Sequence, residues 1–316
     1  MQSRRTFMKR SAMAAAALSA APLAGAREQK ANLPGNREEE SELFFQISLA
    51  EWSLNRALFG GQLDNLDFPA YTKKNFDIHA VEYVNQFFKS ADLSYAKELL
   101  MRTEDLGVRN VLIMIDREGN LGDTDESRRK TAVENHYKWV ECAQFLGCHS
   151  IRVNAGGRGT AEEVAYAATR SLRELSQFAA DYRINVIVEN HGGYSSRGSW
   201  LSSVIRNTGM VNCGTLPDFG NFAVSRGEGG EIYDMYLGMK ELMPLAKGVS
   251  AKSHNFDEDG NESDKDFYRI LKIVRDAGFR GYIGIEYEGR ELGADEGIMA
   301  TKKLLIKAGK AAMEES

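Results

Sequence analysis

Eight short runs of mostly apolar residues recur along this chain, and the residues between them are enough for one helix and its loops. Their midpoints lie about 27 to 40 residues apart, which is the length of one strand-plus-helix unit, and about eight such units fill one barrel domain. A short apolar run bounded by polar or turn residues predicts a buried parallel strand. The pattern therefore favours a single-domain α/β protein with a (β/α)8 barrel. The runs span residues 45–49, 78–83, 110–115, 150–154, 185–189, 212–216, 248–253 and 282–286.

The segments between these runs predict helices. Thr160-x-x-Glu163 has the form of a capping box, an arrangement that begins many helices. Apolar side chains also follow at helical spacing over residues 127–146 and 263–278. A doubly wound open sheet is the alternative architecture. Such a sheet normally has a glycine-rich turn after its first strand, and residues 48–51 (SLAE) have none, so the barrel is favoured.

The composition of the 316 residues excludes several classes of protein. With 43% hydrophobic residues the chain can build a core, so it is not a disordered tail. Three cysteines, none of them with zinc-site spacing, exclude a disulfide-stapled scaffold and are expected to be buried thiols. The net charge of −5 repels phosphate backbones, so no nucleic-acid partner is expected.

The first 26 residues contain four basic residues and no acid, ahead of an acidic body. Arg4 and Arg5 are followed by a large apolar residue, an alanine-rich run over residues 12–21 and a small-x-small site at residues 24–26. This order resembles a twin-arginine export signal, and the run is too short and too weakly apolar to span a membrane. We therefore expect export of the folded protein to the periplasm, with no membrane span in the mature form. An uncleaved anchor or an ordinary secretory signal is the alternative.

The chain is accordingly expected to have three parts. Residues 1–26 are the twin-arginine signal peptide, and the polar residues 27–42 are a loose linker. Residues 43–316 form the barrel that carries the catalytic site. No long stretch rich in proline, glycine or serine interrupts this third part, so it is expected to be one domain.

Acids and a histidine stand at the ends of four consecutive predicted strands. The fifth to eighth strands end in Glu189, Asp218, His254 and Glu286, which are 29, 36 and 32 residues apart. Strand ends meet at the C-terminal face of a barrel, so these four side chains are expected to converge on one point. Three carboxylates and one imidazole suit one divalent ion, Mn²⁺, Mg²⁺ or Co²⁺, with Zn²⁺ as an alternative. Taken singly, each residue could equally be a helix cap or a satisfied histidine.

Four segments resemble the sugar phosphate isomerase/epimerase family, which has xylose-isomerase-like barrels, and the resemblance covers nearly all of the mature chain. It implies that Glu189, Asp218, His254 and Glu286 hold one divalent metal ion, with Mn²⁺ expected first, and that Glu189 and Glu286 are also the acid–base pair. Ketose 3-epimerases of the family often have a histidine three residues after the strand-six aspartate, where this chain has Asn221. Family members often form dimers or tetramers, which implies a homo-oligomer. The segments are VENHGG at 188–193, DFGN at 218–221, SAKSH at 250–254 and GIE at 284–286.

The chemistry implied by this resemblance is proton transfer next to the carbonyl of a small sugar or keto-sugar. The metal would stabilise an enediolate while the two glutamates move the proton, which gives an isomerase or epimerase. Loss of a leaving group from the same site would make a dehydratase or lyase acting on a keto-sugar, keto-glycoside or inosose. A non-catalytic sugar-binding barrel is a third hypothesis. A trinuclear zinc endonuclease barrel is disfavoured, because the chain has only five histidines.

Further side chains near the strand ends are expected to contact the substrate. Lys252 lies two residues before His254 and so faces the same side of the strand, and His191 follows Glu189 by two. Trp52 is expected to wall the pocket, since aromatic faces stack on the C–H edges of sugars. Pairing inside the barrel is the alternative for the polar candidates. The predicted substrate contacts are Lys252, His191, Asn221, Glu82, Asn154 and Trp52, with Arg152 as a further candidate.

Overall fold

A computed structural model describes residue 40 and residues 42–314 of the chain. The predicted signal peptide, residues 1–26, and nearly all of the predicted linker, residues 27–42, lie outside the described residues. All eight predicted strands are present, and their ends differ from the predicted ends by two residues at most. The strands are β1 (Gln46–Ala50), β2 (Ala80–Val84), β3 (Arg109–Met114), β4 (Ser150–Val153), β5 (Asn185–Glu189), β6 (Cys213–Leu216), β7 (Val249–Ser253) and β8 (Tyr282–Tyr287).

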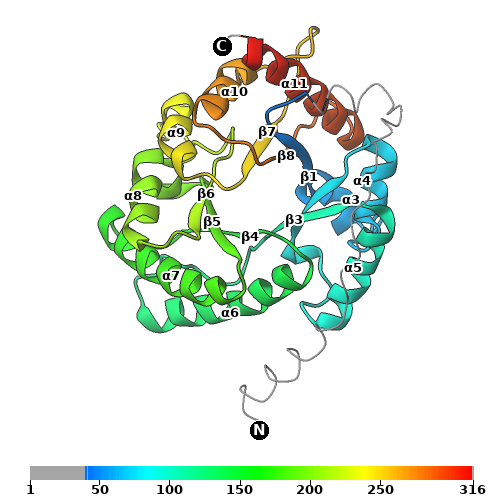
Figure 1. Ribbon diagram of the computed structural model, residues 1–316. Coiled ribbons are helices and arrows are strands. Elements are labelled where there is room, and N and C mark those ends of the chain that lie inside the picture. Colours follow the sequence, from blue (N-terminus) through cyan, green and yellow to red (C-terminus); the bar gives the residue numbers. More distant parts are fainter. Residues whose placement is uncertain (1–39, 41, 315–316) are drawn as a thin grey trace, which may run out of the picture.

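The eight strands form one parallel sheet that curls into a barrel, with the helices arranged around it (Figure 1). The order along the sheet is β6-β5-β4-β3-β2-β1-β8-β7, so successive strands are neighbours and the first pairs with the eighth. Between β6 and β7 the ring closes through two isolated bridges, Thr215 to Ala246 and Asp218 to Ser250. The (β/α)8 barrel expected from the sequence is confirmed, and its least regular pairing lies beside Asp218.

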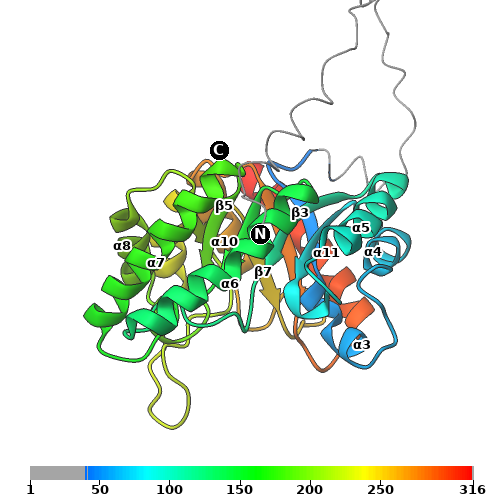
Figure 2. The same cartoon turned by 90° about the horizontal axis from the view of Figure 1, so that it is seen from below.

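The helices cover the outside of the barrel, as the view at right angles also shows (Figure 2). The α-helices are α3 (Asn55–Phe59), α4 (Phe68–Phe76), α5 (Leu93–Leu106), α6 (Glu126–Phe145), α7 (Ala161–Asp181), α8 (Gly198–Thr208), α9 (Met235–Leu242), α10 (Phe267–Asp276) and α11 (Ala294–Glu314). The short 3-10 helices are η1 (Glu51–Leu54), η2 (Asn85–Phe87), η3 (Gly193–Ser196) and η4 (Met243–Leu245). Within the part of the chain that the structure describes, no helix combines the length and the apolar composition needed to cross a bilayer.

Side-chain caps fix where two of these helices begin. At α7 the predicted capping box is present: Thr160 Oγ1 accepts the backbone N–H of Glu163, and Glu163 Oε2 accepts that of Thr160. The predicted start of α10 at Ser263 is wrong. Its N-cap is Asp266, whose carboxylate accepts the backbone N–H of Arg269, so residues 263–265 belong to the preceding loop.

Alternate residues of each strand face opposite sides of the sheet, and they form two separate cores. Outward-facing side chains such as Val81 and Tyr83 pack in the larger core beneath the helices. Inward-facing side chains such as Ala80, Val84 and Met114 fill the barrel. Buried charged residues replace this apolar filling in the inward-facing positions towards the strand ends, and these residues make the candidate site.

Candidate active site

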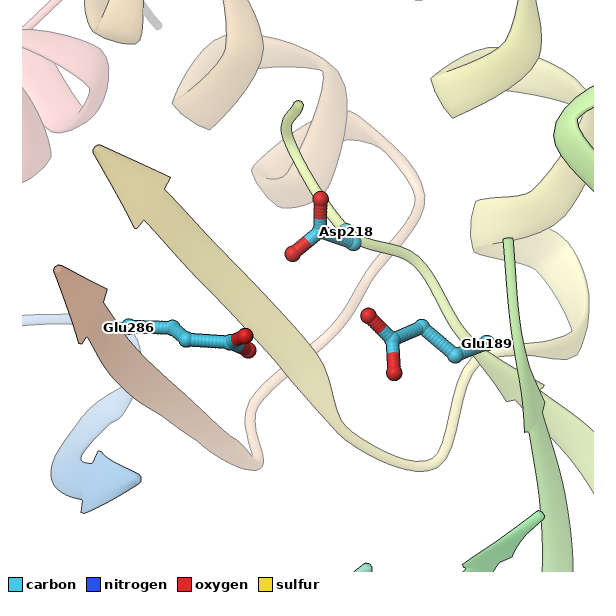
Figure 3. A group of neighbouring side chains, drawn as sticks. All are labelled: Glu189, Asp218 and Glu286. Carbon is cyan, nitrogen blue, oxygen red and sulfur yellow. The ribbon is translucent and has the colours of Figure 1, made fainter. Parts of the chain in front are cut away.

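Three acidic side chains converge inside the C-terminal mouth of the barrel. Glu189 is the last residue of β5, Asp218 follows the end of β6, and Glu286 is an inward-facing residue of β8 (Figure 3). All three are buried, and one carboxylate oxygen from each lies within 4.8 Å of the others. Carboxylates this close repel one another unless cations or protons intervene, so their neighbours decide the chemistry of the site.

Asp218 is fixed by the turn that follows β6. Its Oδ1 accepts the backbone N–H groups of Gly220 and Asn221, each at 2.8 Å. Asn190 holds the backbone on either side: its Oδ1 accepts the N–H of Asp218 at 2.7 Å, and its Nδ2 donates to the Asp218 carbonyl at 3.0 Å. The carboxylate is therefore oriented before any ligand binds, with Oδ2 left facing the other two acids.

A hydroxyl group joins two of the acids. Ser250 Oγ lies 2.7 Å from Asp218 Oδ2 and 2.9 Å from Glu286 Oε2. A hydroxyl has one hydrogen to donate, so one of these contacts needs a proton supplied by a carboxyl group. Burial raises the pKa of Asp218 to about 7 against the opposing charge of Lys252, which makes Asp218 the better holder of that proton.

Glu189 is held by one amide and one guanidinium. Asn221 Nδ2 donates to its Oε1 at 2.9 Å, and Arg152 Nε lies 2.9 Å from its Oε2, close enough for an ion pair but without hydrogen-bond alignment. Burial raises the pKa of Glu189 to about 7, and Arg152 limits that rise. Arg152 is shared, since its Nη1 also donates to Asp116 Oδ1 at 2.8 Å.

Glu286 is paired with a buried lysine. Lys252 Nζ lies 3.2 Å from Glu286 Oε1, 3.3 Å from Glu288 Oε1 and 3.8 Å from Asp218 Oδ2. Burial is the largest influence and acts to raise the pKa of Glu286, but Lys252, Arg152 and Ser250 together outweigh it, so that pKa stays below its ordinary value. Glu189 and Glu286 thus have pKa values shifted in opposite directions, which is how paired carboxyl groups become an acid and a base.

His254 does not join the three acids. It is the first residue after β7, and its side chain is 37% exposed. Its Nδ1 lies 3.1 Å from Lys265 Nζ, and its backbone N–H donates to Glu262 Oε1 at 3.1 Å. Ser250 and Lys252 lie within β7 and face inward, whereas His254 lies one residue beyond the strand, where its pleat no longer directs the side chain. The metal-ligand role expected for His254 stays a prediction that this side-chain position does not support.

The spacing of the three carboxylates alone could hold a metal ion. The four-ligand set implied by the sequence is not assembled, because the imidazole of His254 contacts Lys265 and an ammonium group contacts Glu286 and Asp218 instead. A divalent cation held by the three carboxylates would lie beside the ammonium group of Lys252, and two positive charges placed so close together repel each other. The residues as arranged therefore do not fit the expected four-ligand ion.

The other predicted substrate contacts are divided between the mouth and the barrel interior. Asn221 lies in the site through its hydrogen bond to Glu189. His191 is exposed at the rim, close enough to Arg152 and Lys252 for their charges to act on it. Asn154 donates to Asp116 Oδ1 at 2.8 Å, so it supports the partner of Arg152. Each role in substrate binding stays a prediction.

Trp52 lies beside the mouth of the barrel, whereas Glu82 lies in the barrel interior. Trp52 packs against Phe59 and Phe87 and lines a recess of about 250 Å³ together with Glu288, so it is placed beside the mouth. Glu82 is 1% exposed and lies inside the barrel, where Ser48 Oγ donates to its Oε1 at 2.6 Å. Its carboxylate packs against Gly284, two residues before Glu286 in β8, so it lies deeper in the barrel than the three acids, and the alternative of internal pairing fits Glu82 better.

Sequence reasoning missed Asp116, Ser250 and Glu288. Asp116 follows β3 by two residues and faces Arg152, at the same barrel end as the other acids. That position after a predicted strand was the available signal. Ser250 precedes Lys252 by two in β7, so strand alternation could have found it. Glu288 likewise follows Glu286 by two residues, so the same alternation places it on the same side.

The chain belongs to the xylose isomerase-like TIM barrel family, whose family model matches residues 73–304. Solved structures with the same fold include L-ribulose 3-epimerase, at 12% identity and a TM-score of 0.67, with 86% of this chain and 96% of that chain covered. A 3-keto-D-glucoside 4-epimerase from E. coli matches at 14% identity and a TM-score of 0.61, covering 84% and 99%. The IOLI protein with a bound zinc atom matches at 15% identity and a TM-score of 0.65, covering 84% and 98%.

One curated relative shares a short segment at higher identity. The C-glycoside deglycosidase alpha subunit of Arthrobacter globiformis is 38% identical over 66 residues, which are 20% of this chain and 19% of that protein. The chain thus spans about a fifth of the length of the curated relative that it matches.

Proposed function

We propose that this chain is a sugar isomerase or epimerase that moves a proton next to the carbonyl of a small sugar or keto-sugar. The observation that carries the proposal is the pair Glu189 and Glu286, buried across the barrel mouth with one beside Arg152 and the other beside Lys252. Two carboxyl groups with oppositely shifted pKa values suit removal of a proton on one face and its delivery on another. Epimerases among the proteins of the same fold support this choice.

In the proposed reaction Glu286 is the base and Glu189 the acid. Glu286 keeps a low pKa beside Lys252, so it is ionised at neutral pH. Glu189, with a pKa of about 7, holds a proton in a large share of molecules. Asn221 and Arg152 orient Glu189, and Ser250 orients Glu286. A substrate in the mouth would thus meet both groups in fixed positions.

Positive charge must stand beside the oxygens of the enediolate that forms. The sequence favours a divalent ion on the three carboxylates and His254, Mn²⁺ before Mg²⁺, Co²⁺ or Zn²⁺, and metal dependence stays a prediction. The chain itself provides Lys252 and Arg152 at the same place.

Cleavage of a keto-glycoside is the second candidate function. The observation in its favour is the 66-residue match to a C-glycoside deglycosidase subunit, together with the fold shared with a 3-keto-D-glucoside 4-epimerase. The same pair of glutamates would remove a proton beside the keto group, and the aglycone would leave from the next carbon instead of a proton returning.

Solvent exchange tests the proposal. Purified protein in deuterated water is incubated with ketohexoses and with 3-keto-glucosides, and the products are followed by NMR. An isomerase or epimerase incorporates solvent deuterium at the carbon beside the carbonyl, whereas a lyase releases aglycone and forms an enone that absorbs in the ultraviolet. Absence of both exchange and elimination across the panel would contradict the proposal and favour a binding barrel.

A further inference from the structure

Lys252 is a buried cation surrounded by acids. Its side chain is 4% exposed, and its Nζ faces carboxylate oxygens of Glu286, Glu288 and Asp218 at 3.2, 3.3 and 3.8 Å. Glu286 and Glu288 are within hydrogen-bonding distance of this ammonium group, and Asp218 lies at ion-pair distance. Two of these acids, Glu286 and Asp218, belong to the group of three that could hold a metal ion.

The turn after β6 leaves room for this lysine. A Cβ atom added at Gly220 would lie 3.1 Å from Cδ and 3.2 Å from Cγ of Lys252, and 3.1 Å from Cε of Lys265, all of which are tighter than ordinary packing. Glycine at this position therefore lets the stem of Lys252 cross the turn that orients Asp218. The chain is shaped for a lysine at this point of β7.

The imidazole that would complete a metal site is engaged by another group. His254 Nδ1 faces Lys265 Nζ at 3.1 Å, and Lys265 is itself paired with the buried Glu262. An ammonium group can only donate, so that ring nitrogen is the acceptor and cannot also coordinate an ion. Lys265 thus orients the ring through Nδ1, and His254 is not among the side chains that group with the three acids.

Two fixed cations stand where a divalent ion was expected. Arg152 lies 2.9 Å from Glu189 and donates to Asp116, and Lys252 lies against Glu286, Glu288 and Asp218. Together they bring the charge of one divalent ion, divided between the two glutamates. A divalent ion placed among the same oxygens would have to displace the ammonium of Lys252 or tolerate its repulsion.

We infer that the ammonium group of Lys252, and not a bound divalent ion, is the electrophile of this site. The inference rests on the proposed function, since it concerns the charge that stabilises the enediolate. The substrate carbonyl oxygen would take the place of Glu288, the one acidic partner of Lys252 that is partly exposed, at 31%. Lys252 then hydrogen-bonds that oxygen while Glu286 and Asp218 remain in place.

The proton transfer is balanced without an outside reagent. The C–H bond beside the carbonyl breaks, its proton passes to the Glu286 carboxylate, and its electron pair forms the C=C bond of the enediolate. The carbonyl oxygen takes the negative charge beside Lys252 Nζ. Protonation by the Glu189 carboxyl group forms the new C–H bond and restores the carbonyl. Glu286 then releases its proton to solvent and Glu189 takes one up from solvent, which restores the starting state.

Metal binding is the first test, because it does not need a substrate. The full chain is purified, treated with a chelator and titrated with Mn²⁺, with free Mn²⁺ followed by electron paramagnetic resonance. We expect no stoichiometric binding to the unmodified protein, and at least tenfold tighter binding to the Lys252→His variant, which puts an imidazole beside the three carboxylates. Binding of one Mn²⁺ per unmodified chain, tighter than in Lys252→Met, would overturn the inference.

Exchange in deuterated water is the second test. We expect exchange by the unmodified protein to survive chelation, and Lys252→Met to lower it by about 100-fold or more, as when one oxyanion donor is removed. Lys302→Met is the matched control, because Lys302 is equally buried but donates to the carbonyls of Phe76 and Asp77 outside the site. Exchange that chelation abolishes and Mn²⁺ restores, or full activity of Lys252→Met, would contradict the inference.

The two tests separate this inference from the proposed function. If no sugar incorporates deuterium but Mn²⁺ binds only after the Lys252→His change, the proposed function fails. The inference that Lys252 stands in place of the metal ion is then still supported. If exchange occurs but depends on Mn²⁺, the proposed function stands and the inference about Lys252 is wrong. Should Lys252→His not fold, the Mn²⁺ titration of the unmodified chain decides alone.

Discussion

At the residue scale, the site is defined by what stands next to each of its buried carboxylates. Glu189 has an amide and a guanidinium beside it, whereas Glu286 has an ammonium group and a hydroxyl. Burial acts on both in the same direction, so the different neighbours separate their pKa values. Two chemically identical side chains are thereby given different tasks.

Replacing either glutamate with glutamine tests this division. Glu286→Gln removes the base and Glu189→Gln the acid, and each is expected to lower turnover by about 10²- to 10⁴-fold. Steady-state kinetics and deuterium exchange measure the loss, with the exposed Glu291→Gln on the loop after β8 as control. Near-normal turnover in either variant would remove that residue from the mechanism.

Glu82 predicts a pH dependence of stability. Burial inside the barrel raises its pKa to about 8, with repulsion from Glu286 and Glu189 adding to the shift, while Ser48 and Arg152 oppose it. In the unfolded chain this carboxyl ionises near its ordinary pKa of 4.5. The folded state therefore binds one more proton between these values, and its stability falls as pH rises from about 4.5 to 8.

The variant Glu82→Gln should remove this contribution. We expect its free energy of unfolding to fall less than that of the unmodified protein between pH 5 and 8, by about 3 kcal/mol. Urea denaturation at several pH values measures both slopes. Equal slopes would show that Glu82 ionises alike in the folded and unfolded states.

At the element scale, the end of β7 and the turn after β6 act together. Strand alternation sends Ser250 and Lys252 into the mouth, and His254, one residue beyond the strand, lies in the loop. Gly220 in the facing turn gives the Lys252 stem its space. The irregular closure between β6 and β7, by isolated bridges, lies at this same place.

Gly220→Ala is expected to displace Lys252, and with it the stem of Lys265, without disturbing the backbone, since this glycine does not have a positive φ. We predict about a tenfold loss of exchange activity, with the melting temperature changed by only a few degrees. Gly156→Ala is the control, because its added Cβ would meet only Asn120 Oδ1, at 3.8 Å. Unchanged activity in Gly220→Ala would show that the position of Lys252 tolerates the methyl group.

At the scale of the whole molecule, the barrel concentrates acids at one end of an acidic chain. Glu189, Asp218 and Glu286 lie in the mouth with Asp116 and Glu288 around them, and Arg152 and Lys252 balance part of that charge. A small uncharged sugar is accommodated by such a mouth more readily than an anion. Assembly into a homo-oligomer stays a prediction from the family resemblance.

We propose that the chain is exported by the twin-arginine route and acts in the periplasm. Changing Arg4→Lys and Arg5→Lys together keeps the charge but removes both guanidinium groups, and is expected to leave the precursor in the cytoplasm. Cell fractionation and the mass of the secreted chain measure this, and cleavage after Ala26 is expected in the unmodified protein. Arg10→Lys is the control, and unchanged export of the double variant would contradict the route.

Periodicity alone was enough to predict the barrel. Every strand ends within two residues of its predicted position, because each run is mostly apolar and is bounded by polar or turn residues, as expected for a strand buried on both faces. The capping box of α7 was equally readable, since both partners lie within one turn of helix. These features depend on neighbours in the sequence.

The acids of the site were also readable from the sequence, because each ends a strand and strand ends meet at one face. The cations that stand beside these acids could not be predicted from the sequence. Whether Lys252 or His254 enters the mouth depends on where β7 ends, on the space above Gly220 and on Lys265, which are features of three separate segments. The sequence thus determined the barrel and the three carboxylates, and only the tertiary structure decided which cation stands among them, because that choice depends on packing between segments distant in the chain.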